Sequence, residues 1–72
     1  MNIQIAEFSV KFNSNYKIKK VKQVVINRLK LDITIADFEL VYHRKPLEHF
    51  VTIGIYCISD GDTVYLVLLQ IA

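Results

Sequence analysis

Five residues carry side chains that could supply a nucleophile, a base and an orienting group: His43, His49, Cys57, Ser59 and Asp60. Nucleophilic catalysis requires the base to lie within hydrogen-bond reach of the nucleophile, and a third group to hold the base in place. No nucleophile motif surrounds Cys57 or Ser59, and a chain of 72 residues has little room for a pocket that excludes water. The sequence therefore predicts no catalytic residues and no enzymatic activity.

The same side chains are a poor match for a metal site. His43 and His49 lack the paired spacing and the additional thiolates of a structural zinc site. Asp60 and Asp62 flank a glycine, but the further ligands of a calcium-binding loop are missing. We expect residues 59–62 to form a turn, His43 to be solvated, and the protein to bind no metal or other cofactor.

Cys57 is the single cysteine, and it lies in an apolar run between Tyr56 and Ile58. No intramolecular disulfide can form, so the sequence favours a reducing cytoplasm. We expect Cys57 in the core, where apolar surroundings raise the pKa of a thiol and leave it unreactive. The sequence shows neither a secretory leader nor an apolar run of membrane-spanning length, which predicts a cytoplasmic protein without direct membrane insertion.

The composition favours a folded chain, because 53% of the residues are apolar and there are only two Gly and one Pro. The length predicts a single domain over residues 1–72 with a thin core. The net charge is only +2, but residues 1–31 are mainly basic and residues 32–72 mainly acidic. This asymmetry indicates either a dipolar soluble domain or a basic docking surface.

Four lysines gather where a helix is expected to begin, and we call them the basic face: Lys17, Lys19, Lys20 and Lys22. Cations at this end oppose the helix dipole by about 0.3–1 kcal/mol each. They could attract phosphate, an acidic protein or a lipid surface, or they could be a solvated face that keeps the domain soluble. Nucleic-acid binding is disfavoured, because the aromatic residues occupy core-like positions rather than alternating with the lysines: Phe8, Phe12 and Phe38.

Apolar periodicity predicts two short strands before this helix. Ile3 and Ile5 alternate with polar residues, and a second alternating set follows at Phe8, Val10 and Phe12. Only residues 6–7, Ala and Glu, separate the two sets, and they are a poor pair for a tight turn. We expect a short hairpin, a bulged hairpin or one bent strand.

An amphipathic helix is predicted next, because apolar residues recur at a spacing of three and four: Ile18, Val21, Val25 and Leu29. Any residue of Asn13-Ser14-Asn15 could cap its start. Residues 40–42 read as a strand, residues 43–46 as a turn and Leu47 as a short apolar anchor. The expected core contains Ile18, Val21, Val25, Leu40, Ile58, Val64 and Leu66.

The end of the chain predicts a linking segment, a turn and a last strand. Residues 50–58 are too apolar for a free loop, and residues 59–62 form the expected turn. In the run from Thr63 to Leu69, Val64, Leu66 and Leu68 share one face. Tyr65, Val67 and Leu69 lie on the other face, which indicates a central strand or a partner surface.

Residues 40–48 and 56–68 resemble the corresponding stretches of ubiquitin without a gap, and Thr52 and Ile53 fall where ubiquitin has Thr and Leu. The resemblance covers nearly the whole chain, with a shorter first hairpin and a slightly longer loop after the helix. It implies an α+β, ubiquitin-like β-grasp fold, in which a mixed sheet packs on one main helix. Residues 68–72 contain no glycine, so we expect a protein that lacks the Gly-Gly tail through which ubiquitin is conjugated.

Within this superfamily the chain is most similar to the YukD/EsaB proteins, small ubiquitin-like components of bacterial type VII secretion systems. The similarity lies in residues 18–21, residues 31–35, residues 56–62 and the missing Gly-Gly. It implies a non-catalytic, non-conjugated accessory or regulator that binds cytoplasmic parts of a membrane secretion complex. The alternative is a ubiquitin-like interaction domain of eukaryotic or viral origin that engages ubiquitin receptors. Neither reading implies a small-molecule substrate.

The resemblance also implies a docking site. Val41 and Val67 match two residues of the apolar patch on the exposed sheet face of ubiquitin, and strand alternation places Tyr65 and Leu69 beside Val67. We call these four residues the sheet stripe: Val41, Tyr65, Val67 and Leu69. Incidental exposure of strand-forming residues remains the competing interpretation.

Overall fold

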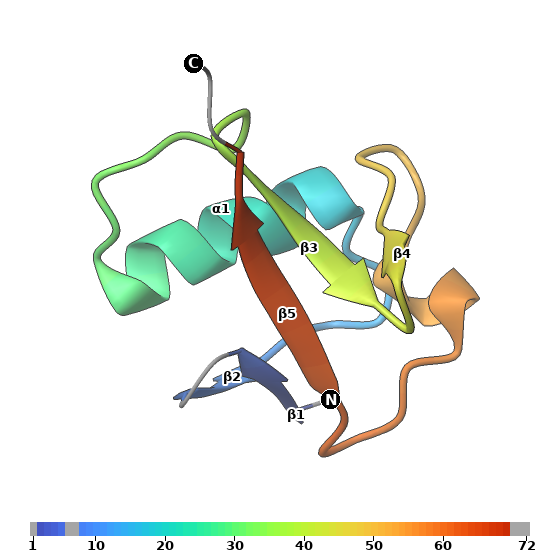
Figure 1. The fold of residues 1–72 in the computed structure, drawn as a ribbon. Helices are drawn as coiled ribbons and strands as arrows, with labels where there is room; N and C mark the ends of the chain where they lie inside the picture. Colours follow the sequence, from blue (N-terminus) through green and yellow to red (C-terminus); the bar gives the residue numbers. More distant parts are fainter. Residues whose placement is uncertain (1, 6–7, 70–72) are drawn as a thin grey trace.

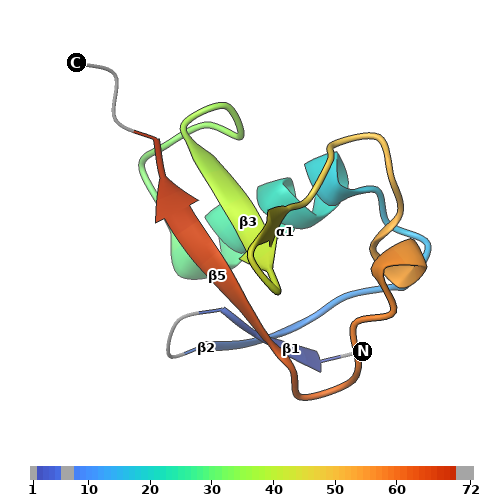
Figure 2. The ribbon, with the colours of Figure 1, turned by 45° about the vertical axis from the view of Figure 1, so that its right-hand side comes forward.

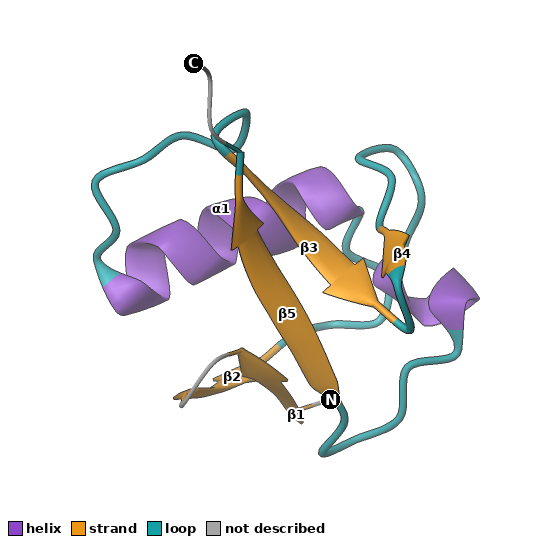
Figure 3. Cartoon of the chain, in the orientation of Figure 1, coloured by secondary structure: helices purple, strands orange, loops and turns teal. Residues whose placement is uncertain are grey.

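The computed structural model describes residues 2–5 and 8–69. A five-stranded sheet carries one α-helix on one of its faces, and the strand order is β2-β1-β5-β3-β4. Figures 1 and 3 show α1 crossing β3 and β5 on the same side of the sheet. β1 and β5 are parallel, whereas every other neighbouring pair is antiparallel. The predicted mixed sheet on one main helix is therefore confirmed.

The first two strands form an antiparallel hairpin. β1 (Asn2–Ile5) pairs with β2 (Phe8–Lys11), and Ile5 lies opposite Phe8. The expected connection at residues 6–7 lies outside the described residues. Figure 2 shows this hairpin at one side of β5, away from β3 and β4.

Helix α1 (Ile18–Leu29) begins later than a side-chain cap at residues 13–15 would place it. Lys17 occupies the N-cap position in an extended conformation and makes no side-chain cap. The first helical amides are instead satisfied by a distant segment, since Ile18 N–H donates to Val51 O at 2.9 Å and Lys19 N–H to His49 O at 3.1 Å. The capping prediction for residues 13–15 is therefore wrong. Asn13 instead accepts a hydrogen bond from the amide of Asn15.

A tight turn joins β3 (Phe38–Tyr42) to β4 (Lys45–Pro46). His43 and Arg44 both have positive φ, 51° and 66°, as a two-residue primed turn requires. The apolar linking segment contains a short 3₁₀-helix, η1 (Ile53–Tyr56), and residues 59–62 form the predicted turn before β5 (Thr63–Leu68). β5 lies in the middle of the sheet, which confirms the prediction of a central strand.

The core fills the space between α1 and the sheet. The predicted core residues are all buried except Leu66, which is half-buried and packs against the others. Leu47 is buried as the expected anchor, and Phe12 and Phe38 are buried as well. Phe8 is a correction: 54% of its side chain is exposed, because it lies at the end of the first hairpin where the sheet has no further cover. None of the helices in residues 2–5 and 8–69 has the length and apolarity needed to cross a membrane.

Candidate functional site

The sheet stripe lies across the centre of the sheet face opposite α1. Val41 pairs directly with Tyr65, and Glu39 pairs with Val67, in the antiparallel ladder of β3 and β5. Paired residues of such a ladder point to the same face, and residues two apart on one strand do so too. Phe38 and Leu40 point to the core from β3, so Glu39 and Val41 point away from it together with Tyr65 and Val67.

Exposure of the sheet stripe is high for apolar residues. Tyr65 is 63% exposed, Val67 45% and Leu69 46%, whereas Val41 is half-buried. An open depression of about 630 Å³ lies beside Val41, Tyr65 and Val67, and the turn residues His43 and Arg44 line its rim. The structure thus brings the strand residues of the predicted site together on one surface.

Three of the four basic-face lysines also lie together. Lys17, Lys19 and Lys20 are exposed and line a shallow groove of about 320 Å³ with Gln23 and Ile35. Lys20 Nζ lies 5.7 Å from the centre of the Tyr16 ring.

Lys22 is a correction to the predicted basic face. Its side chain is 2% exposed and points into the protein, where Nζ donates hydrogen bonds to Phe38 O at 2.8 Å and Ile35 O at 3.2 Å. Nζ also lies 2.7 Å from His49 Nε2 and 5.2 Å from the centre of the Phe38 ring. Lys22 cannot contact a partner at the helix surface.

Burial affects the protonation of both members of this contact. It lowers the pKa of Lys22, and the nearby Glu39 carboxylate partly opposes the shift. It also lowers the pKa of His49, an effect that the positive charges of Lys22 and Lys19 reinforce and that Glu39 opposes. His49 therefore favours the neutral state.

Three of the five side chains that could have formed a nucleophile, base and orienting group make other contacts. His43 is exposed and stacks on Tyr42, with ring centroids 4.0 Å apart, whereas His49 contacts Lys22. Asp60 accepts a hydrogen bond from the Asn2 amide. Among residues 2–5 and 8–69 no group of three His, Cys, Asp or Glu side chains is arranged to hold a metal ion.

Cys57 is also a correction, since it is exposed rather than in the core. The chain reverses direction here, because Cys57 ends η1 with a left-handed backbone, φ 55°. The apolar neighbours on either side therefore do not predict burial at this position, and the Cys57 side chain is exposed.

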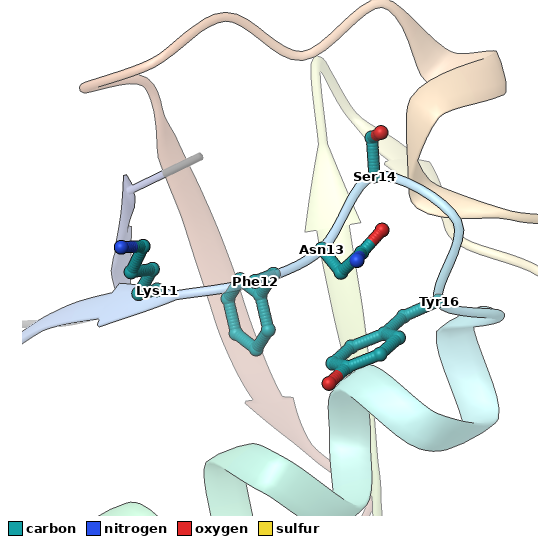
Figure 4. A pocket seen from close by; sticks show the side chains of 5 residues that line it. All are labelled: Lys11, Phe12, Asn13, Ser14 and Tyr16. Atoms are coloured by element: carbon teal, nitrogen blue, oxygen red, sulfur yellow. The ribbon is translucent and has the colours of Figure 1, made fainter.

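Two further depressions lie outside the sheet stripe and the basic face. Lys11, Phe12, Asn13, Ser14 and Tyr16 line an open one of about 740 Å³, and Figure 4 shows Ser14 and Phe12 pointing to opposite sides of the backbone. The Tyr16 amide donates to Asn13 O and the Gly54 amide donates to Ser14 O. Both backbone oxygens are therefore already engaged in hydrogen bonds within the protein.

The second depression is apolar and has a volume of about 390 Å³. Phe8 and Leu68, which are 54% and 60% exposed, form its open side at the end of the first hairpin and of β5. Strand alternation correctly gives the face of Leu68. It does not reveal that Leu68 is left largely exposed at the end of β5.

Comparison of the sequence with protein-family models and with curated proteins finds no match. Solved structures do match. A computationally designed protein based on human erythrocytic ubiquitin superposes with a TM-score of 0.78 and 21% identity, over 100% of this chain and 92% of that protein. The ubiquitin-like domain of Plasmodium falciparum Dsk2 superposes with a TM-score of 0.75 and 20% identity, over 94% of this chain and 93% of that domain. The chain therefore has the ubiquitin-like β-grasp fold.

Proposed function

We propose that this protein is a non-catalytic, non-conjugated binding protein that docks protein partners through the sheet stripe. The observation that carries the proposal is the direct pairing of Val41 with Tyr65, beside Val67, on the sheet face that α1 does not cover. When a partner removes such a cluster of apolar and aromatic side chains from water, their burial favours binding. Tyr is also enriched among the residues that contribute most to binding free energies.

The basic face is a weaker docking surface. Lys17, Lys19 and Lys20 are solvated, and an exposed ion pair contributes only about 0–1 kcal/mol. With Lys22 buried, the face has also lost one of its predicted charges. The lysines can speed association with an acidic partner by steering it, but steering is screened by salt.

The first candidate partner class is the cytoplasmic part of a type VII secretion complex. The resemblance of residues 18–21, 31–35 and 56–62 to YukD/EsaB proteins supports this class. In this reading the protein is a cytoplasmic accessory or regulator, one domain over residues 1–72.

The second candidate class is the ubiquitin receptors, which a ubiquitin-like interaction domain would engage. The structural likeness to the ubiquitin-like domain of Dsk2 supports it, and so do Val41 and Val67, which match two ubiquitin patch residues. The predicted absence of a Gly-Gly tail falls on residues 70–72, outside the described part of the chain.

An NMR titration tests the proposal and separates the two classes. The ¹⁵N-labelled protein is titrated with a purified cytoplasmic domain of a type VII membrane component and, separately, with a ubiquitin-receptor domain. We expect one of them to shift the amide signals of Val41, Tyr65 and Val67 more than those of Lys17, Lys19 and Lys20. Largest shifts at the three lysines, or no binding by either domain, would contradict the proposal.

A further inference from the structure

The hydrogen-bond pattern of the contact between Lys22 and His49 depends on the protonation state of both side chains. An ammonium group has three N–H donors and no acceptor. Lys22 Nζ has three oxygen or nitrogen neighbours, Phe38 O at 2.8 Å, Ile35 O at 3.2 Å and His49 Nε2 at 2.7 Å. When Lys22 is charged, each of these three atoms accepts one hydrogen bond from the ammonium. His49 Nε2 must carry a lone pair, so the imidazole is neutral and its single proton is on Nδ1.

A second proton cannot be accommodated in this geometry. Protonation of His49 converts Nε2 from an acceptor into a donor that faces another donor at 2.7 Å. It also places an imidazolium next to an ammonium whose side chain is 2% exposed. The charged groups around the ring are Lys22 and Lys19 from α1 and Glu39 from β3, so two cations face it against one carboxylate.

The segment that carries His49 is also the segment that satisfies the start of α1. His49 O accepts from Lys19 N–H at 3.1 Å, and Val51 O accepts from Ile18 N–H at 2.9 Å. Leu47 and Ile53, at the two ends of this segment, are buried in the core. Repulsion at His49 therefore acts on the backbone contacts that take the place of a helix cap.

We propose that the Lys22–His49 contact is an acid-sensitive latch, which holds the segment from Leu47 to Ile53 against the start of α1 at neutral pH and releases it when His49 takes up a proton. The released segment leaves the first amides of α1 without acceptors and opens the edge of the core. A mildly acidic environment thus loosens one end of the domain.

The direction of the effect follows from proton linkage. The unfolded state binds a proton at the ordinary histidine pKa of about 6.5, and the folded state binds it only at lower pH. The contribution of the latch to stability is therefore present above pH 6.5 and is lost as the pH falls through the folded pKa of His49. Free carboxylates titrate near pH 4, so the window from pH 7.5 to 5.0 mainly reports histidine.

Thermal unfolding of the wild type and two variants tests the latch. We expect the Tm of the wild type to fall by about 4–8 °C between pH 7.5 and 5.0. His49→Gln keeps an acceptor for Lys22 but does not titrate, so its Tm should fall by less than half as much. His43→Asn is the matched control: it removes the other histidine from an exposed turn that tolerates Asn at positive φ, and its Tm should fall as in the wild type.

NMR of the wild type gives an independent readout that does not depend on a variant folding. Imidazole ¹⁵N shifts at pH 7.5 should show His49 with a bare Nε2 and a protonated Nδ1, and the His49 pKa should lie below the ordinary histidine value of about 6.5. Protection factors of the Ile18 and Lys19 amides should drop at pH 5.0 before that of Leu40. A protonated Nε2 at pH 7.5, or an equal Tm fall in His49→Gln and the wild type, would overturn the proposal.

Discussion

Tyr42 donates a hydrogen bond of 2.6 Å from its hydroxyl to Asp62 Oδ2, which ties the end of β3 to the turn that precedes β5. The same carboxyl oxygen accepts the Ser59 amide at 3.0 Å. The hydrogen bond from Tyr42, followed by that from Ser59, lowers the pKa of Asp62, and the bond to Asp62 raises the pKa of Tyr42. One carboxylate thus holds the turn beside the sheet stripe.

The acid limb of the stability profile should depend on this bond. A carboxyl group with a lowered folded pKa contributes stability that is present above its unfolded pKa, near 3.8, and is lost as the pH falls through the folded pKa. Tyr42→Phe should therefore lower stability at pH 7 and flatten the decline below pH 4, as measured by urea unfolding. Tyr65→Phe, at an exposed tyrosine, is the control. Identical acid limbs for Tyr42→Phe and the wild type would rule out this role.

A series of Leu→Ala changes should follow burial along one face of β3 and β5. Leu40 is fully buried and pairs with the half-buried Leu66, whereas Leu68 is 60% exposed. Leu40→Ala should cost about 2–5 kcal/mol through lost burial and a cavity, and Leu68→Ala at most about 0.5 kcal/mol. Leu66→Ala should fall between them in urea denaturation. Equal costs for all three would contradict the packing of this face on α1.

Removing the buried ammonium should destabilise the protein. Lys22→Met keeps the aliphatic stem but leaves Phe38 O and Ile35 O without their donor, which should cost about 1–3 kcal/mol. Lys19→Met removes an exposed cation from the unfavourable end of the helix dipole and should be neutral or slightly stabilising. Chemical denaturation at pH 7 compares the two. A stabilised Lys22→Met would show that desolvation of the charge outweighs its hydrogen bonds.

The β3–β4 turn should accept glycine with a gain in stability. Arg44 adopts φ 66°, a conformation that costs an L-residue about 1–2 kcal/mol. Glycine removes this strain, but it also raises the entropy of the unfolded chain, which offsets part of the gain in stability. Arg44→Gly should therefore stabilise the protein by about 0.5–1 kcal/mol. The reverse change, Gly61→Ala at φ 87°, has free space around it and should destabilise through backbone strain alone. Thermal unfolding of both variants checks the pair, and a destabilised Arg44→Gly would show that the strain is absent.

The order of elements could be predicted because each has its own period. Apolar spacings of three and four residues predict α1, and apolar alternation predicts β5. The sequence therefore also predicts that Tyr65 and Val67 lie on the same face of β5. Lys22 could not be placed in the same way. It lies four residues after Ile18 and four before Ile26, at the edge of the buried helix face, but its partners are 13 to 27 residues away.

The other corrections come from one set of distant contacts and from one local backbone conformation. The first amides of α1 bind His49 O and Val51 O instead of the side-chain caps expected at residues 13–15. No local sequence pattern reveals these two acceptors. Cys57 follows apolar neighbours, but Cys57 itself has a left-handed backbone at the end of η1, and its side chain is exposed. Local patterns predict which face a side chain occupies, whereas burial depends on where the covering element ends.

The sheet stripe would bind through apolar contacts and the basic face through charges, so the salt dependence of the binding affinity distinguishes the two surfaces. Apolar docking through the sheet stripe should weaken by less than about threefold between 50 and 300 mM salt, because no charge pair is screened. Docking through Lys17, Lys19 and Lys20 should weaken markedly over the same range. Calorimetric titrations with the partner domain that shifts the stripe amides measure both. Strong salt dependence would favour the lysines.

The most direct test of the sheet stripe is the affinity of Val67→Lys for that partner domain. Glu39 lies opposite Val67, so the new lysine meets a carboxylate and the fold should be kept. Ile55→Lys, at a 68% exposed residue of η1, is the matched control. We predict at least a tenfold loss of affinity for Val67→Lys, and changes within twofold for Ile55→Lys and for Lys19→Glu combined with Lys20→Glu. Binding that survives Val67→Lys and is lost in the double lysine variant would contradict the proposed docking surface.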